Sequence, residues 1–396
     1  MAISLPAIAS PVRQPTWAMR LCALLLLVRA GSDTALEALR DQSGGMGPGA
    51  VLNGLMLLAA LRLALLRPHP LAAVVLPMWA PFLLAGLASV AVAPDTGGAL
   101  RLLLVQASYC AAFALPFWLI RHQADRLYWL RLMLCSSLLP VGWALAELAS
   151  SGGQTRLQAT FIHPNIFAFY LLLMVALVLY LQRAAPGRAR WLLWLYILVL
   201  LALLVFTRTR SAWAGCLLLF LIYGLLAERH FLLYAVLAPG LLLLGDDVRN
   251  RLLDIAAGAY DDEGQLNSYA WRQLLWRAGL RWMDGLHWLH GYGLESFRFY
   301  SPQFYPMPGQ DSWDPHNVYI QLYFETGVIG LAAYAWLFWR LLPRLLAVAS
   351  NWRAAVIALA VAMAYLLTSW SDNMLYYLSF NWYFWFFLGS ACVRED

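Results

Sequence analysis

The chain has 396 residues, of which 62% are hydrophobic and 12% are charged. Soluble globular domains are about 45–50% apolar and about 25% charged, so this composition excludes an ordinary water-soluble fold. The formal charge of +6 does not indicate nucleic-acid binding, because the arginines lie in the gaps between apolar runs and are not gathered on one exposed face.

Apolar runs recur along most of the chain at lengths near the roughly 20 residues that a helix needs to cross a bilayer. Lipid accepts only helices and closed barrels, and unbroken Leu, Ala and Val runs favour helices. The sequence therefore predicts an all-α, polytopic membrane protein of about twelve transmembrane helices. The expected spans lie near residues 17–39, 50–66, 71–92, 99–120, 127–149, 161–182, 191–207, 211–227, 231–244, 317–340, 353–370 and 376–392.

These spans divide the chain into three regions. Residues 1–244 hold spans one to nine, residues 245–316 form one large outer loop, and residues 317–396 hold spans ten to twelve. The first span is expected to be retained, because Arg29 and a polar continuation follow it where a signal peptide would have a small-residue cleavage site.

The arginines predict the orientation. Short connections after the second, fourth, sixth and tenth spans are basic, and the positive-inside rule places such connections in the cytoplasm. Their arginines are Arg62, Arg67, Arg121, Arg126, Arg183, Arg188, Arg190, Arg340 and Arg344. Both termini are then cytoplasmic, and the loop of residues 245–316 lies outside the membrane.

This outer loop has too many aromatic residues for a solvated tail. Apolar residues recur every three to four positions from Leu266 to Trp282, which predicts an amphipathic helix. Loops of this length are usually functional or disordered, so the aromatic content favours a folded, functional segment.

His316 is the first candidate for chemistry. It follows Asp314-Pro315, a pair typical of a helix start, so the imidazole is expected at the outer end of the tenth span. A histidine there can exchange a proton near neutral pH. The alternative is an interfacial histidine that hydrogen-bonds a neighbour.

Arginines at the outer boundary form a second group of candidates. Arg208 and Arg210 lie between two apolar runs, where an arginine must reach solvent or bind an anion. Arg272, Arg277 and Arg281 lie on the predicted loop helix, the last two one turn apart. Their alternatives are ordinary snorkelling for the first pair and solvated surface charge for the others.

A third candidate segment precedes the sixth span and contains Arg156, His163, Pro164 and Asn165. Proline is favoured in the first turn of a helix, so a helix is expected to begin at Pro164. The alternative interpretation is a helix start with polar boundary residues and no further role.

Together these residues resemble a known family. The run from His316 to Leu331, His-Asn-Val-Tyr-Ile-Gln followed by Glu-Thr-Gly and Gly-Leu, is similar to the HN-x-YLQ-x-L-x-ETG-x-x-GL signature of the O-antigen ligase and polymerase superfamily. It departs at Ile320 and Tyr323. The Thr-Phe-x-His-Pro-Asn segment, Arg210-Ser-Ala and the Gly-Tyr-Gly-Leu turn at 291–294 also resemble family features, in the family's order.

The resemblance implies a fold similar to the multi-span glycosyltransferases (GT-C-like) that use lipid-linked donors. It implies transfer of a glycan from undecaprenyl diphosphate to an acceptor hydroxyl, such as that of lipid A core, on the periplasmic side of a bacterial inner membrane. Carried over residue by residue, the catalytic roles fall on Arg210, Arg272 and His316. Arg277 and Arg281 fit the place of Arg272 almost as well.

Further substrate-binding roles are expected for Arg156, His163, Asn165, Arg208, Arg277, Arg281 and Asn317. No metal or other cofactor is expected, because arginines supply the charge that a divalent ion would otherwise supply. The acidic groups at 246–247 and 261–263 lack metal-ligand spacing and are typical of a solvated loop face.

Two alternatives stay open. A polymerase that joins repeat units would use the same donor chemistry as a ligase. A flippase or exporter of lipid-linked sugar would usually carry charges in mid-span, and such charges are sparse in this sequence.

Overall fold

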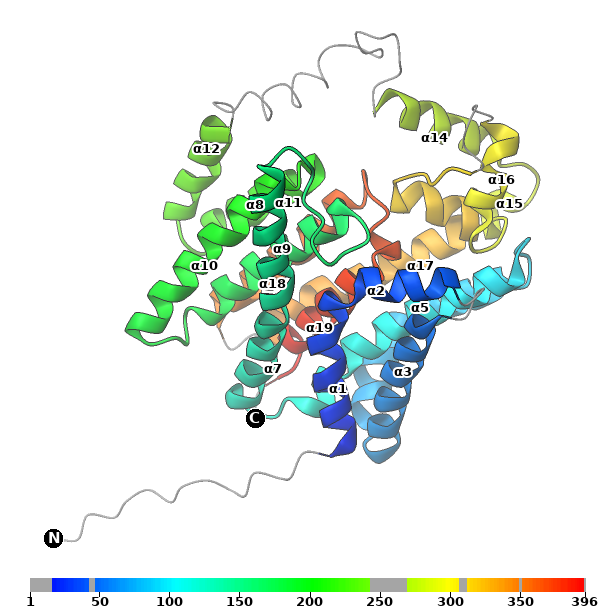
Figure 1. Ribbon diagram of the computed structural model, residues 1–396. Helices are drawn as coiled ribbons and strands as arrows, with labels where there is room; N and C mark the ends of the chain where they lie inside the picture. Colours follow the sequence, from blue (N-terminus) through cyan, green and yellow to red (C-terminus); the bar gives the residue numbers. More distant parts are fainter. Residues whose placement is uncertain (1–15, 43–46, 243–268, 306–311, 349–350, 395–396) are drawn as a thin grey trace, which may run out of the picture.

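A computed structural model describes residues 16–42, 47–242, 269–305, 312–348 and 351–394 (Figure 1). Across these ranges the regular structure is helical throughout, which confirms the predicted all-α class. In chain order the helices are α1 (Trp17–Val28), η1 (Arg29–Gly31), α2 (Asp33–Gln42), α3 (Pro48–Leu66), η2 (Leu71–Val75), α4 (Leu76–Val90), α5 (Thr96–Ala114), α6 (Pro116–Leu119), α7 (Gln123–Ser136), α8 (Leu138–Ser151), α9 (Pro164–Leu181), α10 (Gly187–Phe206), α11 (Arg210–Leu226), α12 (His230–Leu242), α14 (Ala270–Trp282), α15 (His287–His290), α16 (Ser296–Phe304), α17 (Val318–Val348), α18 (Trp352–Thr368), η3 (Met374–Tyr376) and α19 (Leu378–Ala391).

Seven helical stretches within the described ranges are long and apolar enough to cross a membrane. They are Pro48–Leu66, Leu71–Val90, Thr96–Leu119, Gln123–Ser151, Pro164–Leu181, Gly187–Phe206 and Val318–Val348. Two apolar helices, α11 and α18, are shorter. Length and composition therefore support a multi-span membrane protein.

Helix α9 lies at the centre of the bundle. It is apolar on every side, and 89% of its apolar stretch is buried against other helices, whereas only 22% of α10 is. A helix that is hydrophobic all round is stable only where neighbours cover every face. Helices α7, α10, α11, α18 and α19 pack against α9 and provide that cover.

The first predicted span, 17–39, is wrong as a single helix. Helix α1 ends at Val28, the 3-10 turn η1 follows, and α2 turns away from the axis of α1 (Figure 1). A buried ion pair fixes this break, since Arg29 Nη2 lies 2.9 Å from Asp33 Oδ1. The Thr160 hydroxyl also donates to the Ala30 carbonyl at 2.7 Å. Pairing within one turn allows both charges to be buried.

Helices α14, α15 and α16 gather over one end of α17 (Figure 1). Helix α14 begins at Ala270 and ends at Trp282, within the predicted amphipathic helix of the loop. The start of that predicted helix, residues 266–268, and the acidic groups at 246–247 and 261–263 lie outside the described residues.

A glycine contact holds these helices on α17. Gly327 interrupts α17 with φ of 64° and ψ of −167°. The interruption turns two carbonyls towards the Gly-Tyr-Gly turn, where the Tyr292 N–H donates to Phe324 O and the Gly293 N–H to Glu325 O, both at 2.9 Å. A Cβ added to Gly327 would lie 2.2 Å from the Leu289 carbonyl carbon, so the two backbones touch directly.

This contact predicts that Gly327→Ala destabilises the protein by at least about 2 kcal/mol, because the new methyl meets backbone and the φ/ψ pair is nearly restricted to glycine. Thermal unfolding of the purified protein in detergent measures the effect. Gly54→Ala, in the interior of α3 with nothing within 4 Å of the added methyl, is the matched control. Equal unfolding temperatures for the two variants would contradict the proposed contact.

Candidate functional site

The site begins at the start of α9. Pro164 is the first residue of α9, as the sequence predicts, and His163 caps the helix by accepting the Asn165 N–H on its Nδ1 at 3.1 Å. This bond leaves the imidazole neutral, with its other nitrogen protonated. Burial, and then the charge of Arg156, lowers the pKa of His163 below its ordinary value.

Arg156 connects the start of α9 to the end of α10. Its guanidinium donates to Asn165 Oδ1 at 2.8 Å, to Thr209 Oγ1 at 3.2 Å and to the Thr207 carbonyl at 3.0 Å. These bonds hold two interhelical connections, which are about 50 residues apart in the sequence, against each other.

Arg208 and Arg210 lie on the second of these connections. Arg208 has a left-handed φ of 54° and donates to the Gly153 carbonyl at 3.0 Å. Arg210 begins α11 and is half-buried. A left-handed φ is uncommon for a residue with a side chain and is often kept at functional sites. Both guanidinium groups therefore arise from a turn whose backbone is held in place.

Asp372 is the centre of this network, and sequence reasoning missed it. Its carboxylate accepts hydrogen bonds from Asn165 Nδ2 at 2.6 Å, from the Tyr377 hydroxyl at 2.9 Å and from the Ser211 hydroxyl. Its exposed fraction is 2%. Burial raises the pKa of Asp372, and the Ser211 hydrogen bond and the charge of Arg272 oppose that rise.

Arg272 approaches the same carboxylate from α14. Its Nη1 donates to the Ser371 carbonyl at 3.1 Å, and its guanidinium lies 5.5 Å from the centroid of the Trp271 ring. Burial lowers the pKa of Arg272, and Asp372 opposes the shift. Arg277 and Arg281, one and two turns further along α14, are exposed, so Arg272 is the α14 arginine that reaches this network.

His316 lies on the segment that leads into α17. Its φ of 48° is left-handed, and its ring meets the Trp271 ring edge to face at 5.9 Å between centroids. Burial, followed by the charges of Arg272 and His163, lowers the pKa of His316 to about 3. Its Nδ1 is buried, and none of the described residues hydrogen-bonds it. The imidazole is therefore neutral near pH 7 and lies close enough to Arg272 for the charge of that arginine to act on it.

The cap of α17 differs from the sequence prediction. Asp314 was expected to cap the helix, but Asn317 does so, because its Oδ1 accepts the Tyr319 and Ile320 N–H groups at 2.9 and 3.0 Å. The helix therefore begins at Val318, and His316 precedes it. The Val318 N–H also donates to the Ser369 carbonyl at 2.9 Å, which ties His316 to the end of α18.

The other polar residues of the tenth-span motif contact neighbouring helices. Gln321 Nε2 donates to Glu325 Oε1 at 3.1 Å and contacts the Tyr376 hydroxyl. The Glu325 carbonyl accepts the Ser89 hydroxyl at 2.7 Å. These contacts connect α17 to η3 and α4, so Glu325 joins helices beside the site.

The structure thus brings together residues from five distant segments at one end of the bundle. Arg156, His163 and Asn165 come from the segment that leads into α9, Arg208 and Arg210 from the turn that begins α11, Arg272 from α14, His316 from the segment before α17, and Asp372 from the connection after α18. Arginines can grip a phosphate with two parallel hydrogen bonds, and a neutral histidine can accept a proton. Within the described part of the chain no three His, Cys, Asp or Glu side chains are grouped so that they could hold a metal ion.

Fold and site define a helical membrane protein with a cluster of arginines and two histidines at a single end of its bundle. Residues 195–335 match the family model described as O-antigen ligase, a stretch that contains Arg208, Arg210, Arg272 and His316. This match confirms the predicted resemblance to the O-antigen ligase superfamily, whose members are membrane glycosyltransferase-like ligases and polymerases. No curated protein matches the chain.

The Asp372 network predicts a stability effect. Asp372→Ala leaves three buried donors without an acceptor, which should cost about 2–4 kcal/mol of unfolding free energy. Glu37→Gln, in the exposed pair of Glu37 with Arg40 at 2.9 Å, is the control and should cost less than about 0.5 kcal/mol. Thermal unfolding of both variants in detergent tests this, and a similar small loss in both would refute the central role of Asp372.

His316 predicts a pH effect. Its pKa is about 3 in the folded protein against an ordinary value of 6.5, so below pH 6.5 the unfolded chain binds a proton that the folded one does not. Folding stability from this group is therefore complete above pH 6.5 and falls by about 1.4 kcal/mol for each pH unit below it, down to about pH 3. Unfolding temperatures at pH 7.5 and 5 should differ less for His316→Gln than for the wild type. His69 is exposed, so His69→Gln should keep the wild-type difference in unfolding temperature between the two pH values. The same difference in all three proteins would contradict the role assigned to His316.

Proposed function

We propose that this protein is an O-antigen ligase-like glycosyltransferase that moves a glycan from undecaprenyl diphosphate to an acceptor hydroxyl. The observation that carries the proposal is the approach of Arg272 from α14 to His316 and Asp372, next to the α9 and α11 arginines. A lipid-linked diphosphate is the ligand class that needs several cations at a membrane boundary. The family match supports this class of donor and acceptor.

In this scheme Arg210 and Arg272 hold the diphosphate. The acceptor oxygen attacks the anomeric carbon, the bond from that carbon to the diphosphate oxygen breaks, and its electron pair stays on the diphosphate. Negative charge grows on the leaving group, so preorganised cations stabilise the transition state more than the ground state. Because arginines supply this charge, the scheme requires no metal.

His316 takes the acceptor's proton. Burial, and then the charge of Arg272, keeps its pKa at about 3, which would make it a weak base. A bound diphosphate adds negative charge beside Arg272 and so favours the protonated imidazole. Donor binding therefore raises the basicity of His316, and the proton moves only when the leaving group is in place.

Arg156, His163, Asn165 and Arg208 have supporting roles in the proposal. Arg156 and Asn165 lie between the Arg208–Arg210 turn and Asp372 and hold them in register. Asn317 sets the direction of the His316 segment by capping α17. The exposed Arg277 and Arg281 have no part in holding the diphosphate.

We also propose the orientation of the chain. Four connections or helix ends, at 62–67, 121–126, 183–190 and 340–353, carry ten arginines and one acid, Asp125. The positive-inside rule assigns them to the cytoplasm. The site, at the other end of α9, then faces the periplasm in a bacterial inner membrane, with both termini in the cytoplasm.

The catalytic proposal is tested with purified protein and a lipid-linked glycan donor. His316→Ala, Arg210→Ala and Arg272→Ala should each lower the rate of glycan transfer by at least about 100-fold. Arg277→Ala and Arg281→Ala, from the same helix as Arg272, are matched controls and should change the rate by less than about threefold. Near-normal turnover in the first three variants would end the assignment.

The product of the same assay distinguishes the two family activities. Modification of lipid A core at its terminus is the result expected for a ligase. Lengthening of the lipid-linked chain would identify a polymerase. The proposed acceptor would then be wrong, and the proposed donor chemistry would be unchanged. Translocation of the donor without bond formation would instead identify a flippase.

A further inference from the structure

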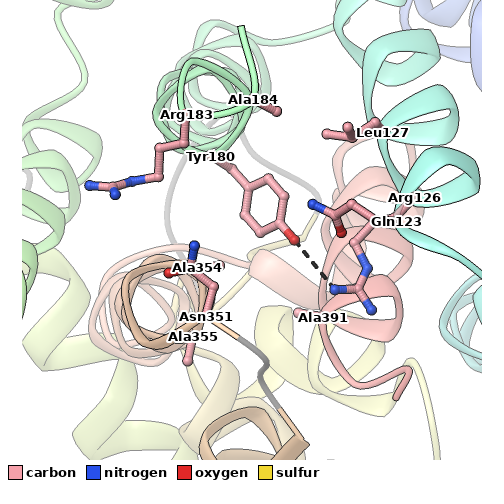
Figure 2. Close-up of a pocket in the computed structure, with 10 residues that line it drawn as sticks. All are labelled: Gln123, Arg126, Leu127, Tyr180, Arg183, Ala184, Asn351, Ala354, Ala355 and Ala391. Carbon is pink, nitrogen blue, oxygen red and sulfur yellow. Dashed lines mark hydrogen bonds between the residues drawn. The ribbon is translucent and has the colours of Figure 1, made fainter. Parts of the chain in front are cut away.

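A cavity of about 210 Å³ lies at the end of the bundle opposite to the Asp372 site. Four polar side chains reach it, those of Gln123, Arg126, Tyr180 and Asn351, and Arg183 lies at its edge (Figure 2). Leucine and alanine side chains form the rest of its wall.

The position of this cavity follows from the helices that end there. Arg126 belongs to the first turn of α7, Tyr180 to the last turn of α9, and Asn351 caps α18. Helix α9 has 18 residues and begins at the Asp372 site, so its rise separates the cavity from that site by about 27 Å. The cavity therefore has no part in the proposed transfer reaction.

Specific contacts hold the polar groups in the cavity. Arg126 donates to the Tyr180 hydroxyl at 3.5 Å and to the Val393 carbonyl at 2.6 Å. Its exposed fraction is 5%, although arginine is rarely buried to this extent. In Figure 2 the side chains of Arg126 and Tyr180 point towards each other, whereas Arg183 points away. Arg183 forms an ion pair with Glu228.

The surroundings of the cavity are strongly cationic. The four segments 62–67, 121–126, 183–190 and 340–353 at this end carry ten arginines and one acid, and Glu228 of a neighbouring connection adds a second acid. Such an excess attracts anions, and basic pockets between helices at the cytoplasmic side of membrane proteins bind the headgroups of anionic lipids.

Two observations place the cavity at headgroup level. Trp352, next to Asn351, is 53% exposed, and exposed tryptophans are enriched where lipid meets water. Leu127 lines the cavity, and the adjacent Tyr128 is 55% exposed on the outer surface of α7. Exposed aromatic side chains therefore lie next to the cavity on both α7 and α18.

We propose that this cavity binds the phosphate group of an anionic phospholipid from the leaflet at the arginine-rich end. Arg126 supplies the charge, and Gln123 and Asn351 add polar contacts from opposite sides. The bound lipid would join the ends of α7, α9, α18 and α19, and so would stabilise the bundle far from the catalytic residues.

Native mass spectrometry of the full-length protein, with dioleoyl phosphatidylglycerol or phosphatidylcholine added in equal amounts, tests the proposal. The wild type should retain phosphatidylglycerol preferentially, and Arg126→Gln should lower that retention by about fivefold, the loss expected for one arginine near a charged surface. Arg188→Gln, on the same face and outside the cavity, is the control and should change retention by less than about twofold.

A second variant covers the case in which Arg126→Gln does not fold. Ala354→Leu fills the cavity without removing a charge and should also abolish the preference for phosphatidylglycerol. Equal losses in Arg126→Gln and Arg188→Gln, with none in Ala354→Leu, would show general surface attraction and overturn the proposal. Saturable binding of inorganic phosphate or glycerol 3-phosphate without lipid preference would identify a soluble anion as the ligand, and would likewise overturn the lipid assignment.

Discussion

The arrangement of the site depends on one buried carboxyl group. Asp372 accepts hydrogen bonds from α9, α11 and the segment before α19, and the backbone carbonyl of its neighbour Ser371 fixes Arg272 of α14. Burial of an acid at a membrane boundary costs free energy unless donors and cations surround it, and here they come from separate helices. The position of Arg272 is therefore set in part by a connection that has no direct role in the proposed chemistry.

Much of the fold could be predicted from the sequence because lipid leaves few choices. Apolar runs of about 20 residues must form helices, and Pro164 and the pattern of α14 marked helix positions that the structure confirms. The sequence carries a sign of the break after α1, because Arg29 and a polar run follow the apolar stretch, but the position of the break depends on the buried contact between Arg29 and Asp33. From the sequence alone, Arg29 is expected at the membrane boundary. Its burial is explained only by the contact with Asp33.

The site was harder to predict, for a physical reason. A histidine and arginines next to apolar runs stand out because they must find an anion or solvent, so the residues alone make His316, Arg208 and Arg210 candidates. The choice of Arg272 over Arg277 and Arg281 came from the family resemblance. Asp372 lies in a short polar connection, Ser369 to Asn373, that resembles any other interhelical turn. Its importance arises from distant partners, since Asn165 and Ser211 lie 207 and 161 positions away in the chain. Likewise the motif around His316 contains several residues, among them Asn317, Glu325 and Gly327, whose contacts cap, join or bend helices. The motif therefore contains the residues that position His316 as well as His316 itself.

The link from Asn165 to Asp372 spans 207 positions of the chain. Ribosomes add about 5–20 residues each second, so the amide of Asn165 would emerge about 10–40 seconds before its acceptor exists. During that interval the polar side chains at the start of α9 lack the Asp372 carboxylate as a partner. The Asp372 network can therefore form only after the connection between α18 and α19 has been synthesised. A chain that stopped before this connection would lack the acceptor that joins α9 and α11.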